Sequence, residues 1–315
     1  MNMQVSYHLG AARMALAGAL TLLYPGAPVI AQTDDKPLLF TITQGWISDS
    51  NVLRLPNSID PSSFTGKSAR SDRLLATTAR VSYDNTISAQ RISLWGEANS
   101  VRYSNYDAFN HLGWDVGARW NWEVGRQWYG IASAADRKFL ASFADQRTGT
   151  KNLVSVQDLR FDAGYRLDPR WSIVGAVDTT RRANSLSVLA PNDYRQTGYE
   201  MGARYLSGVG NDFSVVWRHM TGSYPNRQTT DALGNPLPVL VDNGFSQNSL
   251  LLRLQTVPTD KSRISGEAGW TRRSLDALSQ RDFSGPTARL SFVYTPSDAW
   301  VGEAYLRRDL GATEL

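Results

Sequence analysis

The sequence predicts an all-β chain that forms a transmembrane, antiparallel, up-and-down β-barrel of the outer-membrane type. Three observations lead to this prediction. Strand-length segments alternate large apolar residues with polar ones, the connections between them are alternately short and long, and aromatic residues gather beside the short connections. Lipid outside a barrel and water inside it favour this two-faced alternation. We expect residues 1–31 to be a signal peptide and residues 32–315 to form the barrel, with its last strands missing.

The N-terminal segment has the pattern of a secretory signal. An apolar run from Met14 to Leu23 follows Arg13, and small residues at Val29 and Ala31 suit cleavage after Ala31. The run is too short to cross a bilayer as a helix. The chain has no cysteine, which excludes disulfides and attachment to a lipid through cysteine.

Composition narrows the class further. No apolar stretch of helix length follows Gln32, mean hydropathy is −0.34 and 20% of the residues are charged. This excludes a helical membrane protein but not a barrel, because only half of the positions in a barrel strand face lipid. The net charge of +4 falls to +3 without Arg13, which is too small an excess to indicate nucleic acid. Arginine supplies 28 of the 33 basic residues, which suits a charged pore wall or an acidic-sugar ligand, or reflects the composition of the genome.

Thirteen segments are predicted strands, and Leu112–Val124, with its tryptophans opposite Asp, Arg and Glu, has the clearest alternation. Thirteen is an unusual number, because single-chain bacterial barrels close with an even count, and the chain stops at Gly311–Leu315 without an aromatic-ended strand. We therefore expect the final strands to be missing. The predicted strands are Leu38–Trp46, Leu74–Tyr83, Arg91–Tyr103, Leu112–Val124, Trp128–Arg137, Asp158–Leu167, Trp171–Arg182, Thr197–Leu206, Phe213–Met220, Ser249–Gln255, Arg263–Arg273, Thr287–Tyr294 and Trp300–Arg307.

The connections between these segments fall into two classes. Short turns recur about every 40 residues, one per pair of strands, and longer polar segments lie between them. Outer-membrane barrels have short periplasmic turns and long external loops, so this pattern favours a barrel. The predicted turns are Asp84–Ser88, Gly125–Gln127, Asp168–Arg170, Ser207–Asn211, Val257–Ser262 and Thr295–Ala299, and the predicted loops are Ile47–Arg70, Ala141–Val156, Asn184–Gln196, Thr221–Asn248 and Ser274–Ser284.

Two sets of residues follow from the alternation. Aromatic residues beside the short turns are predicted to form a girdle at the periplasmic membrane boundary, namely Tyr83, Trp122, Trp128, Tyr165, Trp171, Tyr205, Phe213, Tyr294 and Trp300, with Tyr129 beside them. Arginines on the opposite face are predicted to line the lumen and a substrate path, namely Arg80, Arg119, Arg160, Arg166, Arg182, Arg204, Arg253, Arg273 and Arg289. Acidic residues share that face, and mixed charge can also serve only to keep a lumen wet.

Catalysis has little support in the sequence. The mature chain has two histidines, His111 near Asp107 and His219 near the loop that contains Asp231. Neither has the spacing of a metal site, and no glycine repeat has a nucleotide-binding context. We therefore expect no enzyme activity, no cofactor and no metal, and we keep an outer-membrane hydrolase as a minor alternative.

Five short segments resemble the EpsL-type barrel proteins of exosortase-associated exopolysaccharide clusters in Gram-negative bacteria, and they occur in the same order. They are Asp49–Pro56, Ser142–Asp145, Arg181–Ser185, Tyr224–Arg227 and Arg281–Gly285. The resemblance runs from about Phe40 to the end. It implies an outer-membrane barrel that assists polysaccharide export, and it implies no catalytic residues.

These observations together predict a conduit or accessory protein in the outer membrane that assists exopolysaccharide export through an arginine-rich lumen. The expected partners are the lipid bilayer, the extracellular polysaccharide and other proteins of an export machinery, with no nucleic acid. Two alternatives remain besides the hydrolase. A general diffusion porin for small solutes would be favoured by a loop folded into the lumen, for which Thr221–Asn248 is long enough, and a secreted β-protein outside the membrane would stay soluble without detergent.

Overall fold

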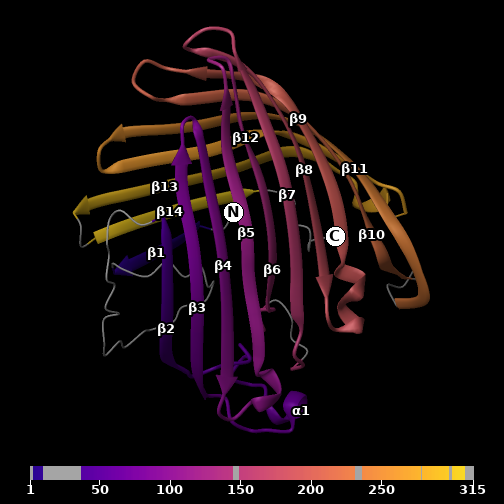
Figure 1. The fold of residues 1–315 in the computed structure, drawn as a ribbon. Coiled ribbons are helices and arrows are strands. Elements are labelled where there is room, and N and C mark those ends of the chain that lie inside the picture. The colour runs from indigo at the N-terminus through magenta and orange to yellow at the C-terminus, as the bar shows by residue number, and fades with distance from the viewer. Residues whose placement is uncertain are drawn as a thin grey trace.

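A computed structural model describes residues 3–9, 37–144, 149–230, 236–277, 279–297 and 300–308. These residues form one antiparallel sheet in which β2 to β14 pair in sequence order and β1 pairs with β14 (Figure 1). The predicted all-β, up-and-down fold is confirmed. The strands are β1 (Met3–Leu9), β2 (Leu38–Asp49), β3 (Asp72–Ile87), β4 (Gln90–Tyr103), β5 (His111–Val124), β6 (Trp128–Leu140), β7 (Leu153–Arg166), β8 (Trp171–Asn184), β9 (Tyr194–Leu206), β10 (Asp212–Thr230), β11 (Pro236–Thr259), β12 (Ser262–Leu275), β13 (Phe283–Ser297) and β14 (Trp300–Arg308).

The ends of the sheet depart from the prediction. Strands β2 to β14 correspond one to one with the thirteen predicted strands, but β1 is an additional strand inside the predicted signal peptide. Cleavage after Ala31, which lies outside the described residues, would remove β1 and leave β14 at the edge. The two edge strands share no ladder in the described residues, so the sheet is not closed there and the predicted barrel, expected to lack its last strands, is not confirmed. Gly311–Leu315 also lie outside the described residues.

The connections separate by length as predicted, except for the predicted loop Thr221–Asn248. Residues 88–89, 125–127, 167–170, 207–211 and 260–261 form short turns at one end of the sheet, and Gly125 and Gly210 supply the positive φ that two of them need. Residues 50–71, 104–110, 141–152, 185–193 and 276–282 connect the strands at the other end, which we call the long-connection end. Short helices lie there: α1 (Ser62–Thr65) and the 3-10 helices η1 (Asp107–Phe109), η2 (Ser187–Asn192) and η3 (Ser279–Arg281).

The predicted loop Thr221–Asn248 is wrong for most of its length. Its residues continue β10 and β11 as a long hairpin, in which Thr221 pairs with Ser246 and Tyr224 with Asn243. The polarity of this segment suggested a loop, but its backbone groups are paired in a ladder, and Tyr224 and Phe245 are buried on one face of the hairpin. The inward-folded loop that would have favoured a porin is therefore not formed by residues 221–230 and 236–248.

The sheet is strongly curved and has two chemically different faces. In Figure 1, β3 to β6 run down the view while β12 to β14 cross them at a steep angle. Side chains on the concave face reach across several strands: the Arg204 guanidinium on β9 donates to the Tyr129 hydroxyl on β6 over 3.1 Å. Strand register then assigns alternate residues of each strand to the concave and convex faces.

The convex face is apolar over most of its height. Ile42, Trp46 and Met201 are 79%, 70% and 64% exposed there. Its charged residues all lie near the long-connection end, and no Asp, Glu, Lys or Arg lies between them and the short turns in the described strands. We call these residues the convex rim. Outside the tip of the β10–β11 hairpin (225–244), the convex rim consists of Arg73, Arg102, Asp136, Lys138, Arg181, Arg195, Arg272 and Arg308.

Buried side chains form two small cores at the long-connection end, the first built largely from connections and the second from the ends of β10, β11 and β12. In the first, Phe109 stacks on Tyr106 at a centroid distance of 5.4 Å and lies 4.7 Å from Phe143. Val52, Leu53 and Leu55 from the β2–β3 connection complete this core. In the second core, Met220, Tyr224, Phe245 and Leu275 pack together. The described residues of the connections that contribute to the first core are therefore folded together rather than extended.

Candidate functional site

The concave face gathers the charged residues that the sequence predicted for it. Register places all nine predicted arginines on this face. Acidic residues from neighbouring strands share it, among them Asp115, Glu123, Asp162 and Glu267. The face is therefore charged and polar, and it forms the candidate functional site.

Glu200 on β9 is the centre of an ion-pair network. Its side chain is 4% exposed and accepts hydrogen bonds from Arg160 on β7, Arg218 on β10 and Arg253 on β11. The Arg160–Glu200 and Arg253–Glu200 contacts measure 3.2 and 2.8 Å. Each arginine also contacts a second carboxylate. We call this group the Glu200 cluster: Glu200, Asp162, Asp178, Glu267, Arg160, Arg218 and Arg253.

A second group lies nearer the short turns, around Tyr129 on β6. The Arg166 guanidinium lies 4.5 Å from the centre of the Tyr129 ring and pairs with Glu123. Arg204 contacts the same ring and pairs with Asp212 at 2.7 Å. Two guanidinium groups therefore hold one aromatic ring, and each has its own carboxylate.

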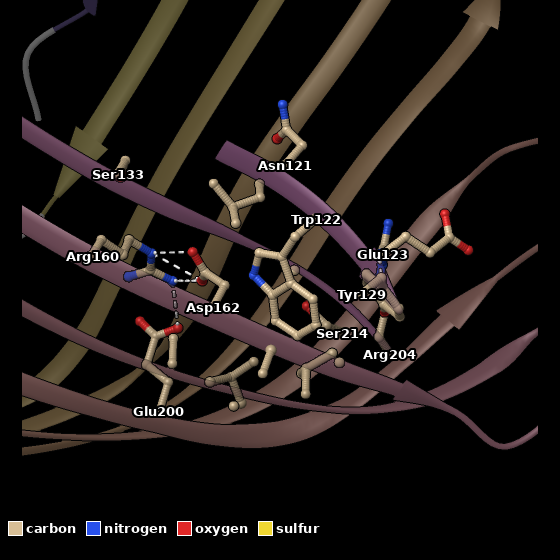
Figure 2. A pocket seen from close by; sticks show the side chains of 18 of the residues that line it. Asn121, Trp122, Glu123, Tyr129, Ser133, Arg160, Asp162, Glu200, Arg204 and Ser214 are labelled. Atoms are coloured by element: carbon tan, nitrogen blue, oxygen red, sulfur yellow. Dashed lines mark hydrogen bonds and ion pairs between the residues drawn. The ribbon is translucent and has the colours of Figure 1, made fainter. Parts of the chain in front are cut away.

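A cavity of about 650 Å³ joins the two groups. Its lining includes Arg160, Glu200 and Arg253 from the Glu200 cluster, and Tyr129 and Arg204 from the second group. Figure 2 shows Arg160 bonded to Asp162 and Glu200 at one end, with Glu123, Tyr129 and Arg204 gathered at the other. Residues from seven strands, β5 to β11, line this cavity, so only a curved sheet can form it.

Charge pairing changes how available the predicted arginines are. The Glu200 cluster holds three arginines and four carboxylates, a net charge of −1. Arg80 approaches Glu97 at 3.8 Å, and Arg273 donates to Gln247. Arg119 differs, because it is exposed, lines the cavity and has only a hydrogen bond from its Nε atom to Asn121 among the described residues. Arg119 is therefore the cavity arginine most available to an anion.

Among the residues of this face that sequence reasoning did not place there are Arg218, Trp95 and Tyr129. Arg218 lies between the outward-facing Trp217 and His219, so alternation from its neighbours could have placed it inward. Trp95 also points inward, where its indole nitrogen donates to Asp115 over 2.7 Å. Tyr129, which was predicted with the girdle residues, is instead on the concave face, because successive residues of a strand face opposite ways and Trp128 faces outward.

Strand register places all nine predicted girdle residues on the convex face beside the short turns, although Trp122 also lines the cavity (Figure 2). Trp128 and Tyr165 are cross-strand partners with ring centroids 4.9 Å apart, and Trp171 and Tyr205 form a second such pair. Trp122 differs from the others. It is only partly exposed, stacks on Phe161 at 5.7 Å, and its indole nitrogen is buried without a partner in the described structure.

The two histidines do not assemble a catalytic group. His219 lies on the convex face, stacks on Trp217 and is 2.9 Å from the Asn248 amide oxygen. His111 lies on the concave face with its Nδ1 atom 2.8 Å from the Phe109 carbonyl. Asp231 lies outside the described residues. Within the described ranges, no three His, Cys, Asp or Glu side chains gather as metal ligands would.

The described helices are short. None of them has the length and apolar character needed to cross a membrane.

The five segments that carry the family resemblance lie at the long-connection end. Asp49–Pro56 and Ser142–Ala144 meet in the first core, although Asp145 lies outside the described residues. Tyr224–Arg227 contributes to the second core, and Asp282 accepts a hydrogen bond there from the Leu275 amide. Lys67 in the β2–β3 connection donates to Asp107 over 2.8 Å, which lowers the pKa of that carboxyl.

No protein-family model matches this chain, and no curated protein is similar to it at a significant level. The EpsL-type resemblance therefore stays a prediction, and the geometry of the two faces carries the functional proposal.

Proposed function

We propose that this chain is an outer-membrane β-barrel whose convex face meets lipid and whose concave face lines a wet path for an exported, acidic exopolysaccharide. One observation carries the membrane part. On the convex face of four strands, an aromatic residue beside a short turn and a basic residue at the convex rim are ten positions apart, namely Tyr83 and Arg73, Trp128 and Lys138, Trp171 and Arg181, and Tyr205 and Arg195.

That spacing matches a bilayer. Ten residues of antiparallel strand extend about 34 Å, and a tilt of 35–45° reduces this to about 24–28 Å along the membrane normal. The lipid-facing band of outer-membrane barrels is about 25 Å tall and is flanked by aromatic residues. In the described strands, the charged residues of the convex face lie only at its rim, and about one bilayer thickness separates them from the aromatic residues beside the short turns. This arrangement supports a surface embedded in lipid rather than a sheet surrounded by water.

The concave face supports a path for a charged polymer rather than a tight binding site. Its arginines are exchangeable donors, because most already contact carboxylates that a passing uronate or pyruvyl group could replace one at a time. A conduit needs contacts that form and break readily. Arg119, which lacks a carboxylate partner among the described residues, is the strongest candidate for direct contact with an acidic sugar.

A depth-dependent substitution series tests the membrane part. Val177→Arg places a charge in the middle of the convex face of β8, whereas Ala183→Arg places one beyond the convex rim of the same strand. A lipid-facing Val177 predicts a loss of about 2–4 kcal/mol in the free energy of unfolding from vesicles, against about 0–1 kcal/mol at Ala183. Equal small effects at both positions would place β8 in water and overturn the proposal.

Deletion of the gene tests the transport part. Polysaccharide trapped in the periplasm, with less at the cell surface, is the expected result. Restoration by the wild-type chain but not by Arg119→Glu would connect the path to the concave face. Unchanged secretion in the deletion strain would overturn the export role and leave the membrane part standing.

A further inference from the structure

Two arginines face each other on the convex rim. Arg181 on β8 and Arg195 on β9 are direct cross-strand partners, and both side chains are exposed. Side chains opposite each other in this way start from Cβ atoms about 4.5–5.5 Å apart, and like charges placed so are destabilising. A sheet that keeps two cations together needs a compensating anion.

The protein supplies no such anion among its described residues. Neither guanidinium has a carboxylate within ion-pairing distance, and the Arg195 Nε atom donates only to the Ser223 hydroxyl, over 3.2 Å. The flanking strands place the neutral Gln157 beside Arg181 and Ser223 beside Arg195. The nearest acids are engaged elsewhere.

These acids are Asp136 and Asp193. Asp136 is on the convex face two strands away from Arg181, and it accepts hydrogen bonds from Trp114 and Gln157. Asp193 precedes β9, and its carboxylate accepts from the Asn184 backbone and side-chain amides.

The surroundings of the arginine pair grade from polar to apolar along the two strands. From the arginine pair toward the short turns, the next convex-face partners are Thr179 with Thr197, and then Val177 with Tyr199. The last such partners are Trp171 and Tyr205, beside the short turns. Charge, then hydroxyl, then apolar surface is the order that one lipid presents from headgroup to acyl chain.

We propose that Arg181 and Arg195 bind the phosphate of an anionic, phosphorylated lipid in the leaflet on the long-connection side. This inference rests on the proposed membrane location. Two guanidinium groups satisfy a phosphate with charge-assisted hydrogen bonds, and the threonine hydroxyls lie where the sugar or glycerol part of the headgroup would continue. The lipid's chains then lie along the apolar part of β8 and β9.

Native mass spectrometry of the purified protein in nanodiscs tests this proposal. The probes are a zwitterionic phosphatidylcholine disc, and the same disc with a small fraction of diphosphorylated lipid A. The variant is the double substitution Arg181→Gln with Arg195→Gln. The matched control is Arg272→Gln, another exposed arginine of the convex rim, whose cross-strand partners Asn248 and Ser284 are neutral.

The wild-type protein and Arg272→Gln should retain bound lipid A. The double variant should lose about 25-fold in affinity, because each arginine near a charged membrane surface contributes roughly fivefold. Millimolar inorganic phosphate should not displace the lipid. Equal retention by the double variant, or displacement by free phosphate, would overturn the lipid site. All proteins would still enter nanodiscs in that case, whereas a chain that stays soluble and enters no disc refutes the proposed function itself.

Discussion

The substitution Glu200→Gln tests whether the Glu200 cluster holds the curved sheet together. Removing one partner of a buried ion pair costs about 3–5 kcal/mol when the remaining charge is left alone. Here each of the three arginines keeps another carboxylate, and Arg160 and Arg253 are 35% and 31% exposed. We therefore expect a smaller loss, about 2–3 kcal/mol in the free energy of unfolding.

The matched control is Asp84→Asn, which breaks an ion pair with Arg91 on the concave face. Both side chains of this pair are exposed. Exposed pairs contribute less than about 1 kcal/mol. Urea unfolding from vesicles, followed by the fluorescence of the ten tryptophans, measures both variants. A Glu200 loss no larger than the Asp84 loss would refute the reasoning. The double substitution Glu200→Gln with Arg253→Gln should lose less than the sum of the single losses, since it removes one of the cations left behind.

Two further predictions concern the concave cavity and the first core. Arg119→Glu should shift the ion selectivity toward cations, measured as a reversal potential in planar bilayers. The control Arg102→Glu, on the convex rim, should leave the selectivity unchanged, and equal shifts in both variants would contradict a path along the cavity. Phe109→Ala should remove about 3–5 kcal/mol from the stability of the first core, so that an added protease cuts residues 50–71 in intact cells while the sheet stays folded. The control is Asp107→Asn at an exposed position, and protease resistance of residues 50–71 in Phe109→Ala would contradict the packing described.

The alternation of side chains made the strands and their faces predictable. Asp, Arg and Glu opposite the tryptophans of Leu112–Val124 indicated the concave side, and register places all nine arginines on that face. Arg218 escaped because its inward neighbours Val216 and Met220 are apolar, so the face looked outward by composition. Alternation from Trp217 alone would have been sufficient to place it.

What the sequence could not indicate depends on distances between strands. The pairing of Arg253 on β11 with Glu200 on β9 requires the curvature of the whole sheet, which no local pattern encodes. The hairpin beyond Thr221 was hidden for a different reason. Polar composition is shared by loops and by polar strands whose backbone groups are paired in a ladder, and hydropathy alone does not separate them.

The free edge of β2 constrains any membrane location. Its convex face carries Phe40, Ile42 and Trp46, all strongly exposed, and its outer row of backbone N–H and C=O groups has no ladder partner in the described sheet. Hydrocarbon supplies no hydrogen bonds, so an unpaired edge does not persist there. The ten-residue spacing on β3, β6, β8 and β9 indicates a lipid location for the convex face. The β2 edge can share that location only if its backbone groups find hydrogen-bond partners in the membrane. Protection of the β2 amides from hydrogen exchange in nanodiscs follows from this reasoning, and rapid exchange there would favour a sheet in water.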